Sequence, residues 1–523
     1  MFAAINAFLT SSVSGYFLNK SLRFRSSASA YLNRTFAGTP NTYTYSVWFK
    51  RGTLGVQQEL VASRAGTASF LELTSSDTIT CGLNNVSICT STAVFRDPAA
   101  WYHAVLTVTQ SSTVTIYING VSVATGTAGA SSFLFNSSYT NTIGQYGNAN
   151  SLYFDGEMAE VNFVDGQALL PTAFGAYSTY NQWLPKKYAG TYGTNGFYLP
   201  FTNTASTSTL VADSSGNGNN WTPNNISLTA GSTYDSLTDV PTLTSTTVAN
   251  YAVLNPLNIG TASSLSNGNL TFSSVSSSGN IQQAQITGTF AIPSSGKWYF
   301  ESTPTSLPVS IYIGVAIVTQ SMGSTPFSGT PIRTYRSSTG YKSNGVTDSA
   351  YGNTYTTSDV IGVAVDMDAG AIYFYKNNTI QNSGNAAFTD LAGTTWMPYC
   401  VAGSSASTVT GSFNFGQQPF VYPTLPTGFL PLNTFNIAAG TVTTSGTFTG
   451  NLSTDGPMVY LNGTPTAMTI NGNAVTFGTH ADKLANGFKV RSSSILYNLI
   501  GSNTYVATTV GAVFKYEDAQ SNP

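Results

Sequence analysis

The chain has 523 residues, and at about 100–200 residues per domain this length predicts about three or four domains. Charged residues make up only 8% of it, against about 25% in an average soluble protein, which argues against long solvated helices. The formal net charge of −2, with no basic block, argues against nucleic acid or an anionic membrane as a partner. No apolar run reaches the about 18 residues of a membrane-spanning helix, so membrane insertion is not expected.

The residues that are abundant in this chain favour short strands. It contains 30 Tyr and 30 Phe, and no Lys or Arg occurs from Tyr188 to Gly296. Aromatic and β-branched side chains suit a pleated, half-buried surface, and Gly and Asn suit the turns between strands. The composition therefore predicts an all-β protein.

The first 20 residues are expected to be an ordered N-terminal arm. Met1–Leu9 is apolar, but it is short and has no basic region before it. It is therefore not interpreted as a signal peptide. Residues 1–20 are instead predicted to act as a docking segment.

The first domain is predicted to cover residues 21–225. Tyr45–Lys50 and Trp101–Val108 alternate apolar and polar residues as strands do. Thr115–Val123 holds an Asn-Gly turn between two β-rich runs, the strongest short-range signal for a hairpin. A second hairpin is expected within Ser151–Gly175, where Asp-Gly turns flank the strand.

Taken in order, these motifs resemble the laminin-G-like (concanavalin-type) jelly rolls that occur in structural proteins of tailed bacteriophages. The DSSGNGN turn at Asp213–Asn219 is a further mark of that family. It follows the run Phe197–Phe201, which is expected to pair back and complete the first sandwich. The resemblance implies a virion component with an antiparallel β-sandwich.

A Ser/Thr-rich linker is predicted over residues 226–249 and a second domain over 250–436. Its most specific motif is Asp359–Gly370, DVIGVAVDMDAG, followed by the strand Ile372–Asn377 and by FNFGQQPF at Phe413–Phe420. These motifs resemble the SPRY domain, another β-sandwich. Alternation places the side chains of Ile361, Val363 and Val365 on the inner face.

The last part, residues 437–523, is predicted to be a small β module with an Asn-Gly hairpin at Met468–Phe477. The predicted fold class is thus all-β: tandem antiparallel β-sandwiches, a laminin-G-like jelly roll and then a SPRY-like sandwich, plus a small C-terminal β module.

No catalytic residues are predicted. The chain has only two histidines, and His103 lies in a strand where a structural role is expected. Glu157 and Glu160 are three residues apart in a predicted strand, so they are expected to face opposite sides of the sheet. Asp366 and Asp368 share one face, and their turn-forming role is favoured over a paired-carboxylate glycosidase site.

No metal site or cofactor is predicted either. The loop acids Asp77, Asp155 and Asp213 could hold Ca²⁺, but the sequence does not show that they converge. The three cysteines include Cys81 and Cys89, which could form a bridge across a hairpin. Two buried small hydrophobic residues are the favoured interpretation.

Binding is the task that both resemblances imply. The loop region RTYRSSTGYKSNGVTDSAYGN of the second domain is the candidate ligand site, because aromatic faces and neutral hydrogen-bonding groups suit sugars. The candidate contacts are Tyr335, Arg336, Tyr341, Lys342 and Tyr351. The alternative is that the tyrosines are packed or lie at a subunit interface.

The predicted function is that of a non-enzymatic bacteriophage virion protein, a tail fibre or virion-attached appendage that contacts the host surface. The expected partners are other tail or capsid proteins and a host glycan or receptor, with homotrimers implied by the resemblance. One alternative is a purely architectural part, such as a capsid decoration protein, a head fibre or a tail adaptor. An alternative of another class is a surface-polysaccharide depolymerase.

Overall fold

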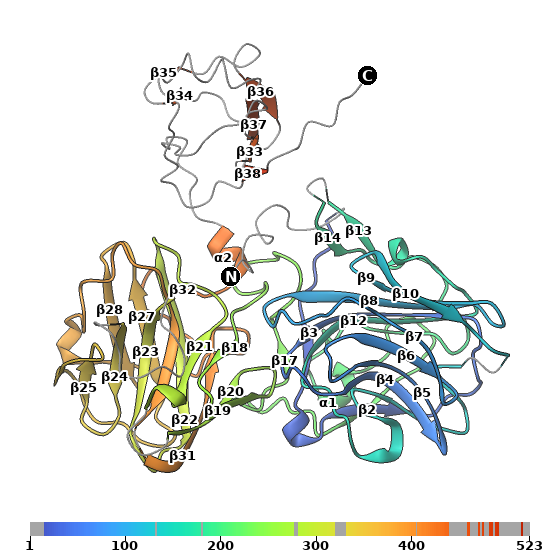
Figure 1. Cartoon of the computed structure of the whole chain (residues 1–523), viewed down its shortest axis with the longest axis horizontal. Helices are drawn as coiled ribbons and strands as arrows, with labels where there is room; N and C mark the ends of the chain where they lie inside the picture. The colour runs from blue at the N-terminus through green and yellow to red at the C-terminus, as the bar shows by residue number, and fades with distance from the viewer. Residues whose placement is uncertain are drawn as a thin grey trace. The chain divides into compact units, whose positions relative to one another are not determined.

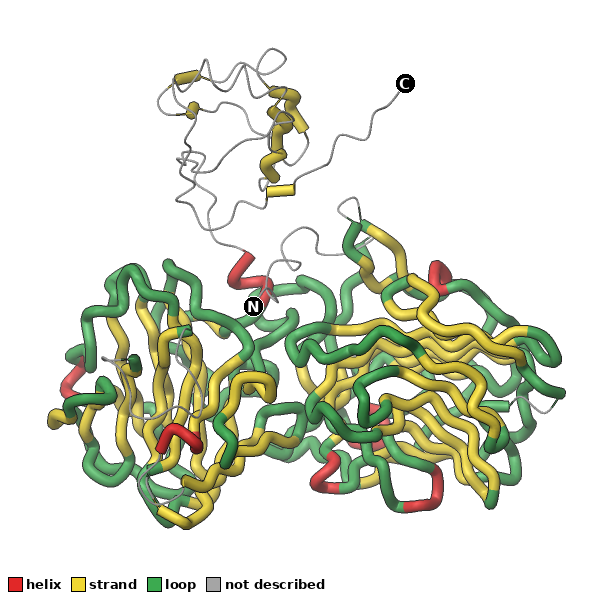
Figure 2. Tube along the Cα trace, in the orientation of Figure 1, coloured by secondary structure: helices red, strands yellow, loops and turns green. Residues whose placement is uncertain are grey.

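A computed structural model describes residues 15–438, except 131–132, 179–180, 277–280, 319–330 and 404, together with short strands beyond residue 457. Within these residues almost all regular structure is strand, which Figure 2 shows in yellow. The α-helices among them are α1 (Thr207–Leu210) and α2 (Thr434–Ala438). The predicted all-β fold is confirmed. None of the helices described is long and apolar enough to cross a membrane.

The first sandwich consists of two large sheets that face each other (Figure 1). In spatial order, the strands of sheet A are β10 (Val121–Thr127), β9 (Thr113–Ile118), β8 (Trp101–Val108), β3 (Tyr43–Arg51), β12 (Gly156–Asp165), β1 (Ser21–Phe24) and β17 (Ser236–Leu237), with β15 (Phe197–Leu199) also paired to β12. Those of sheet B are β16 (Thr222–Asn224), β2 (Tyr31–Arg34), β11 (Thr140–Ile143), β4 (Gln58–Ala65), β5 (Thr67–Leu73), β6 (Ile79–Leu83) and β7 (Val86–Thr90). A separate hairpin is formed by β13 (Gly175–Tyr177) and β14 (Trp183–Pro185).

Two local predictions for this sandwich hold, but the hairpin expected within Ser151–Gly175 does not form, because residues 151–155 are not strand and β12 pairs with β3 and β1 instead. Asn119 and Gly120 have positive φ angles of 50° and 82°, as the turn of a tight hairpin requires, and they join β9 to β10. The run Phe197–Phe201 pairs with β12 through β15, so the prediction that it completes the first sandwich is confirmed. Apolar side chains from both sheets form one core, in which the Phe135 and Phe36 rings stack at 4.4 Å.

The second sandwich also consists of two sheets. The strands of sheet G are β18 (Leu254–Ile259), β21 (Gln285–Gly288), β30 (Trp396–Ala402), β23 (Ile311–Ile317), β24 (Ile332–Arg336), β25 (Tyr341–Ser343) and β26 (Asp348–Ala350). Those of sheet H are β19 (Ser263–Ser266), β20 (Thr271–Ser276), β31 (Ser405–Asn414), β22 (Lys297–Ser306), β27 (Ile361–Asp366), β28 (Ala371–Lys376) and β29 (Thr379–Ile380), with β32 (Leu430–Pro431) parallel to β22. Ile361, Val363 and Val365 point into the core between the sheets, as predicted.

The two sandwiches share a buried junction, and Met1–Ile437 forms one compact unit. Lys50 Nζ, on β3, donates to Asp239 Oδ2 (2.7 Å), to Asn250 Oδ1 (2.8 Å) and to the Tyr251 carbonyl (2.8 Å). The Asn269 side chain donates to the Gly52 carbonyl at 3.0 Å. Asp239 belongs to the segment expected to be a linker. That segment also contributes β17 to sheet A, so it is an integral part of the fold.

The C-terminal unit, Ala438–Pro523, is described only in short strands. One sheet has the order β36 (Ala481–Leu484), β37 (Gly487–Val490), β33 (Met458–Tyr460) and β38 (Phe514–Lys515). The predicted Asn-Gly hairpin has its strands at β34 (Thr469–Ile470) and β35 (Asn473–Ala474). The N-terminal arm is described only from residue 15, so its first 14 residues lie outside the described part.

Cys81, Cys89 and Cys400 are free and buried. Cys81 and Cys89 lie opposite each other on β6 and β7, and burial raises the pKa of the Cys89 thiol to about 11. Because buried, protonated thiols react slowly, we expect almost no labelling by a maleimide reagent in the native protein and three labels after unfolding in guanidinium. Intact-mass measurement checks this, and a single label in the unfolded, unreduced protein would instead indicate a Cys81–Cys89 disulfide.

Candidate ligand-binding face of the second sandwich

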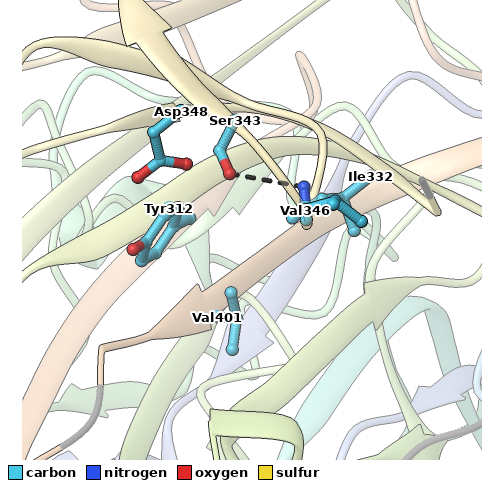
Figure 3. Close-up of a pocket in the computed structure, with 7 residues that line it drawn as sticks. Tyr312, Ile332, Ser343, Val346, Asp348 and Val401 are labelled. Atoms are coloured by element: carbon cyan, nitrogen blue, oxygen red, sulfur yellow. Dashed lines mark hydrogen bonds between the residues drawn. The ribbon is translucent and has the colours of Figure 1, made fainter. Parts of the chain in front are cut away.

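A pocket of about 240 Å³ lies on sheet G of the second sandwich, and Ile332 and Val401, which help to line it, are buried. The β25–β26 hairpin forms one wall, and β23, β24 and β30 form the floor (Figure 3). The residues that line it are Tyr312, Ile332, Ser343, Gly345, Val346, Asp348 and Val401. The lining thus combines an apolar floor with a carboxylate and a hydroxyl.

Local turn chemistry shapes the hairpin. The Asn344 side-chain oxygen accepts hydrogen bonds from the amides of Val346 (2.9 Å) and Thr347 (2.8 Å), which closes an Asx turn. Gly345 has a φ of 95°, a conformation that favours glycine. Val346 lies at the tip and is 63% exposed. The turn therefore holds an apolar side chain over the pocket at the edge of the sheet.

An ion pair lies beside the pocket. Arg336 Nη1 donates to Asp348 Oδ2 at 3.1 Å, and the Arg336 guanidinium carbon lies 5.2 Å from the centre of the Tyr312 ring. The two charged side chains are about one-third exposed, at 31% and 33%. Arg336 Nε has no hydrogen-bond partner among the described residues. This nitrogen is itself buried.

The structure separates the five predicted contact residues. Arg336 lies at the pocket, and Tyr341 is 40% exposed on β25. Lys342 points to the opposite face, where Nζ donates to the Ala387 carbonyl at 2.5 Å. The ligand-binding role of these three residues stays a prediction.

Two of the five are core residues. Tyr335 is fully buried, its ring stacks on Phe374 at 5.4 Å, and its hydroxyl donates to the Asn353 carbonyl. Tyr351 is 6% exposed, and its ring meets that of Tyr335 at 5.8 Å. The prediction that these two tyrosines contact a ligand is wrong, because both rings pack in the core of the second sandwich.

Sequence reasoning did not single out Tyr312, Ile332 or Val401 as pocket residues. They come from three different strands of sheet G. Tyr312 on β23 lies opposite Val401 on β30 and opposite Arg336 on β24, the strand that also carries Ile332. Alternation could have placed Tyr312 opposite its buried neighbour Ile313. It could not have shown which strands lie beside it.

The acidic residues weighed as catalytic groups are engaged in structure. Asp366 pairs with Lys297 at 2.5 Å and accepts from the Ala369 amide at 3.0 Å. Asp368 accepts from the Gly296 amide at 2.7 Å. Both carboxylates therefore fix the turns on which they lie.

Glu157 and Glu160 were expected on opposite faces of the sheet, and this expectation is wrong. The pairing of β12 with β3 shifts register between Ala159 and Asn162, and Glu160 has a φ of 53°. This β-bulge resets the alternation, so Glu160 reaches the outer face of sheet A, on which Glu157 also lies.

His103 is buried and stacks on Trp48 with ring centres 4.7 Å apart. Its Nδ1 accepts a hydrogen bond from Trp183 Nε1 at 2.9 Å, so the proton is on Nε2, which lies 2.8 Å from Ser46 Oγ. Burial lowers the pKa of His103 to about 3. This tautomer cannot take a proton from Ser46, so the pair does not have the arrangement of a serine nucleophile and its base.

The three loop acids considered for Ca²⁺ are held by separate partners. Asp77 pairs with Arg51 at 2.8 Å, Asp155 accepts from Thr53 Oγ1 at 2.6 Å, and Asp213 accepts from the Tyr198 amide at 2.9 Å. Within the described part of the chain, no group of three His, Cys, Asp or Glu side chains is placed to hold a metal ion.

Each of the two sandwiches matches a known protein family. Residues 25–172 match the concanavalin A-like lectin/glucanases superfamily, and residues 297–418 match the SPRY domain. Over 144 residues the chain is 32% identical to Ran-binding protein 10 of Danio rerio and to Ran-binding protein 9 of Xenopus tropicalis. The match covers 27% of this chain and 23% and 25% of those proteins, so the chain spans about a quarter of their length.

Among solved structures, the SPRY domain of human HERC1 is 17% identical and covers 28% of this chain and 87% of that one, with a TM-score of 0.22. Stonustoxin is 18% identical over 31% of this chain and 27% of its own, with a TM-score of 0.25. The family matches and the two sandwiches agree in position and order. The chain therefore carries a laminin-G-like (concanavalin A-like) domain followed by a SPRY domain.

Proposed function

We propose that this chain is a non-enzymatic structural protein of a tailed-bacteriophage virion, a tail fibre or attached appendage that contacts the host surface during adsorption. The observation that carries the proposal is the buried junction around Lys50 and Asp239, which joins two domains of binding-module families into one compact unit. Two sandwiches joined in this way can act as a spacer with a binding face at one end. We further propose that copies assemble as homotrimers on the virion.

The pocket beside Arg336 supports the second sandwich as the host-contacting part. Its floor contains Tyr312, Ile332 and Val401, and its rim contains Ser343 and Asp348. A sugar ring, with one apolar face and several hydroxyls, suits such a lining, and so does a short side chain of a surface protein. Its size of about 240 Å³ fits one such group.

Immunogold electron microscopy of intact particles, with antibody against the full chain, tests the location. Label on fibres or on the tail supports the proposal. Uniform label over the head indicates a decoration or head-fibre protein, and no label on any particle rejects the virion role. Release of sugar fragments from host polysaccharide by the purified chain would establish the depolymerase alternative.

Binding to host cells tests the face. Replacing Arg336 with alanine is expected to weaken binding of the fluorescently labelled full chain about tenfold, because it removes a charged side chain beside the pocket, and truncating a contact residue costs about 1–3 kcal/mol. The matched control is Lys376→Ala, because Lys376 is also partly exposed (24%) and paired with a carboxylate, Asp359, but lies on sheet H. Equal binding by the Arg336→Ala variant and the unsubstituted chain would exclude this face.

A further inference from the structure

Residues 15–20, here called the strap, cross the outer face of sheet A and form hydrogen bonds with the segment that leads into the second sandwich. The Leu18 amide donates to Thr242 Oγ1 at 3.0 Å, and the Leu18 carbonyl accepts from Thr244 Oγ1 at 2.7 Å. The Leu18 side chain packs in a separate apolar cluster with Trp48, Trp101, Ala159, Trp183 and Val240. The strap therefore covers aromatic surface that does not belong to the main core.

The other fastening of the strap is a buried carboxyl group. Tyr16 Oη donates to Glu160 Oε1 at 2.6 Å, Tyr198 Oη donates to Glu160 Oε2 at 2.9 Å, and the two hydroxyls are 3.0 Å apart. Glu160 is 3% exposed and lies in the β-bulge of β12 with its backbone in the left-handed region. Non-glycine residues in this conformation are costly and cluster at clamps and switches.

Burial is the main influence on the pKa of Glu160. Burial raises its pKa to about 7, although the hydrogen bonds from Tyr16 and Tyr198 and the nearby Lys187 act in the opposite direction. Burial also raises the pKa of Tyr16, Tyr198 and neighbouring Tyr192, so these hydroxyls stay protonated. Glu160 is thus the group of this cluster that titrates near neutral pH.

We propose that Tyr16, Glu160 and Tyr198 form a pH-dependent latch that holds the strap closed over the tryptophans of sheet A. With the strap closed, Glu160 keeps its proton up to pH about 7, whereas an exposed glutamate loses it near 4.5. Opening of the strap therefore releases a proton from Glu160, so the population of the open state increases as pH rises. Linkage gives about a tenfold increase in the opening equilibrium constant between pH 6 and 8, and at most about 300-fold over the full range.

Hydrogen exchange of the full chain between pH 5 and 9, corrected for intrinsic amide rates, measures the latch. We expect the strap amides to lose protection about tenfold from pH 6 to 8, with a parallel shift of tryptophan emission to longer wavelength as Trp48, Trp101 and Trp183 become hydrated. His103, which contacts two of these rings, stays neutral over this range because burial lowers its pKa to about 3.

Three variants distinguish a latch from general loosening. Glu160→Gln should abolish the pH response, and Tyr16→Phe should lower strap protection at every pH while Glu160 remains. Glu301→Gln is the matched control, because Glu301 is also buried, has a pKa that burial raises to about 7, and lies in the second sandwich away from the strap. A pH response that survives in Glu160→Gln, or its absence from the unsubstituted chain, would overturn the latch.

Discussion

Replacing Lys50 with methionine is expected to lower the free energy of unfolding by about 3–5 kcal/mol at pH 7. The Lys50 side chain is 2% exposed, and its ammonium group uses all three donors on Asp239, Asn250 and Tyr251. Without it, the buried carboxylate of Asp239 keeps the hydrogen bond from Trp101 Nε1 at 2.9 Å but loses its cationic partner. Guanidinium unfolding of the full chain measures the loss.

The stability that Lys50→Met loses should depend on pH and on whether Asp239 is still present. Burial raises the pKa of Asp239, and removing the ammonium raises it further, so the variant should lose stability as pH rises through that pKa and recover part of it in acid. Adding Asp239→Leu to Lys50→Met should restore part of the stability, because an apolar pair replaces an unpaired ion. Arg336→Met breaks a partly exposed ion pair and should cost about 1 kcal/mol or less. Equal losses from Lys50→Met and Arg336→Met would contradict the role of the junction.

Local sequence signals predicted much of the fold because the interactions behind them are local. The Asn119-Gly120 turn needs only two residues with positive φ, and both have them. The alternation of Ile361, Val363 and Val365 follows from the pleat alone. The junction was not predictable in this way, because Lys50 and Asp239 are 189 residues apart in sequence.

The candidate site was predictable only in part for the same reason. Its region was found from the turn-rich loop that contains Asn344 and Gly345, but its floor depends on strand order across sheet G. The bulge at Glu160 shows a second limit. Strict alternation assumes an unbroken ladder, and one extra residue moved a carboxyl group to the other face of the sheet.

Replacing a core tyrosine is expected to destabilise the protein far more than replacing a surface tyrosine. Tyr335→Ala should lower the free energy of unfolding by about 3–5 kcal/mol, because it removes a fully buried ring. That ring packs against Tyr351, Tyr355 and Phe374. Tyr341→Ala, at a side chain 40% exposed, should change the unfolding free energy by about 0.5 kcal/mol or less.

Guanidinium unfolding and host-cell binding, measured on the same two variants of the full chain, separate packing from recognition. If the ligand face is the one at Arg336, Tyr341→Ala should leave stability unchanged and reduce binding, because its ring lies exposed on β25, one strand of the pocket hairpin. Tyr335→Ala should reduce binding only in proportion to the unfolded fraction. A Tyr335→Ala protein as stable as the unsubstituted chain, yet unable to bind cells, would mean that this ring leaves the core to meet the ligand.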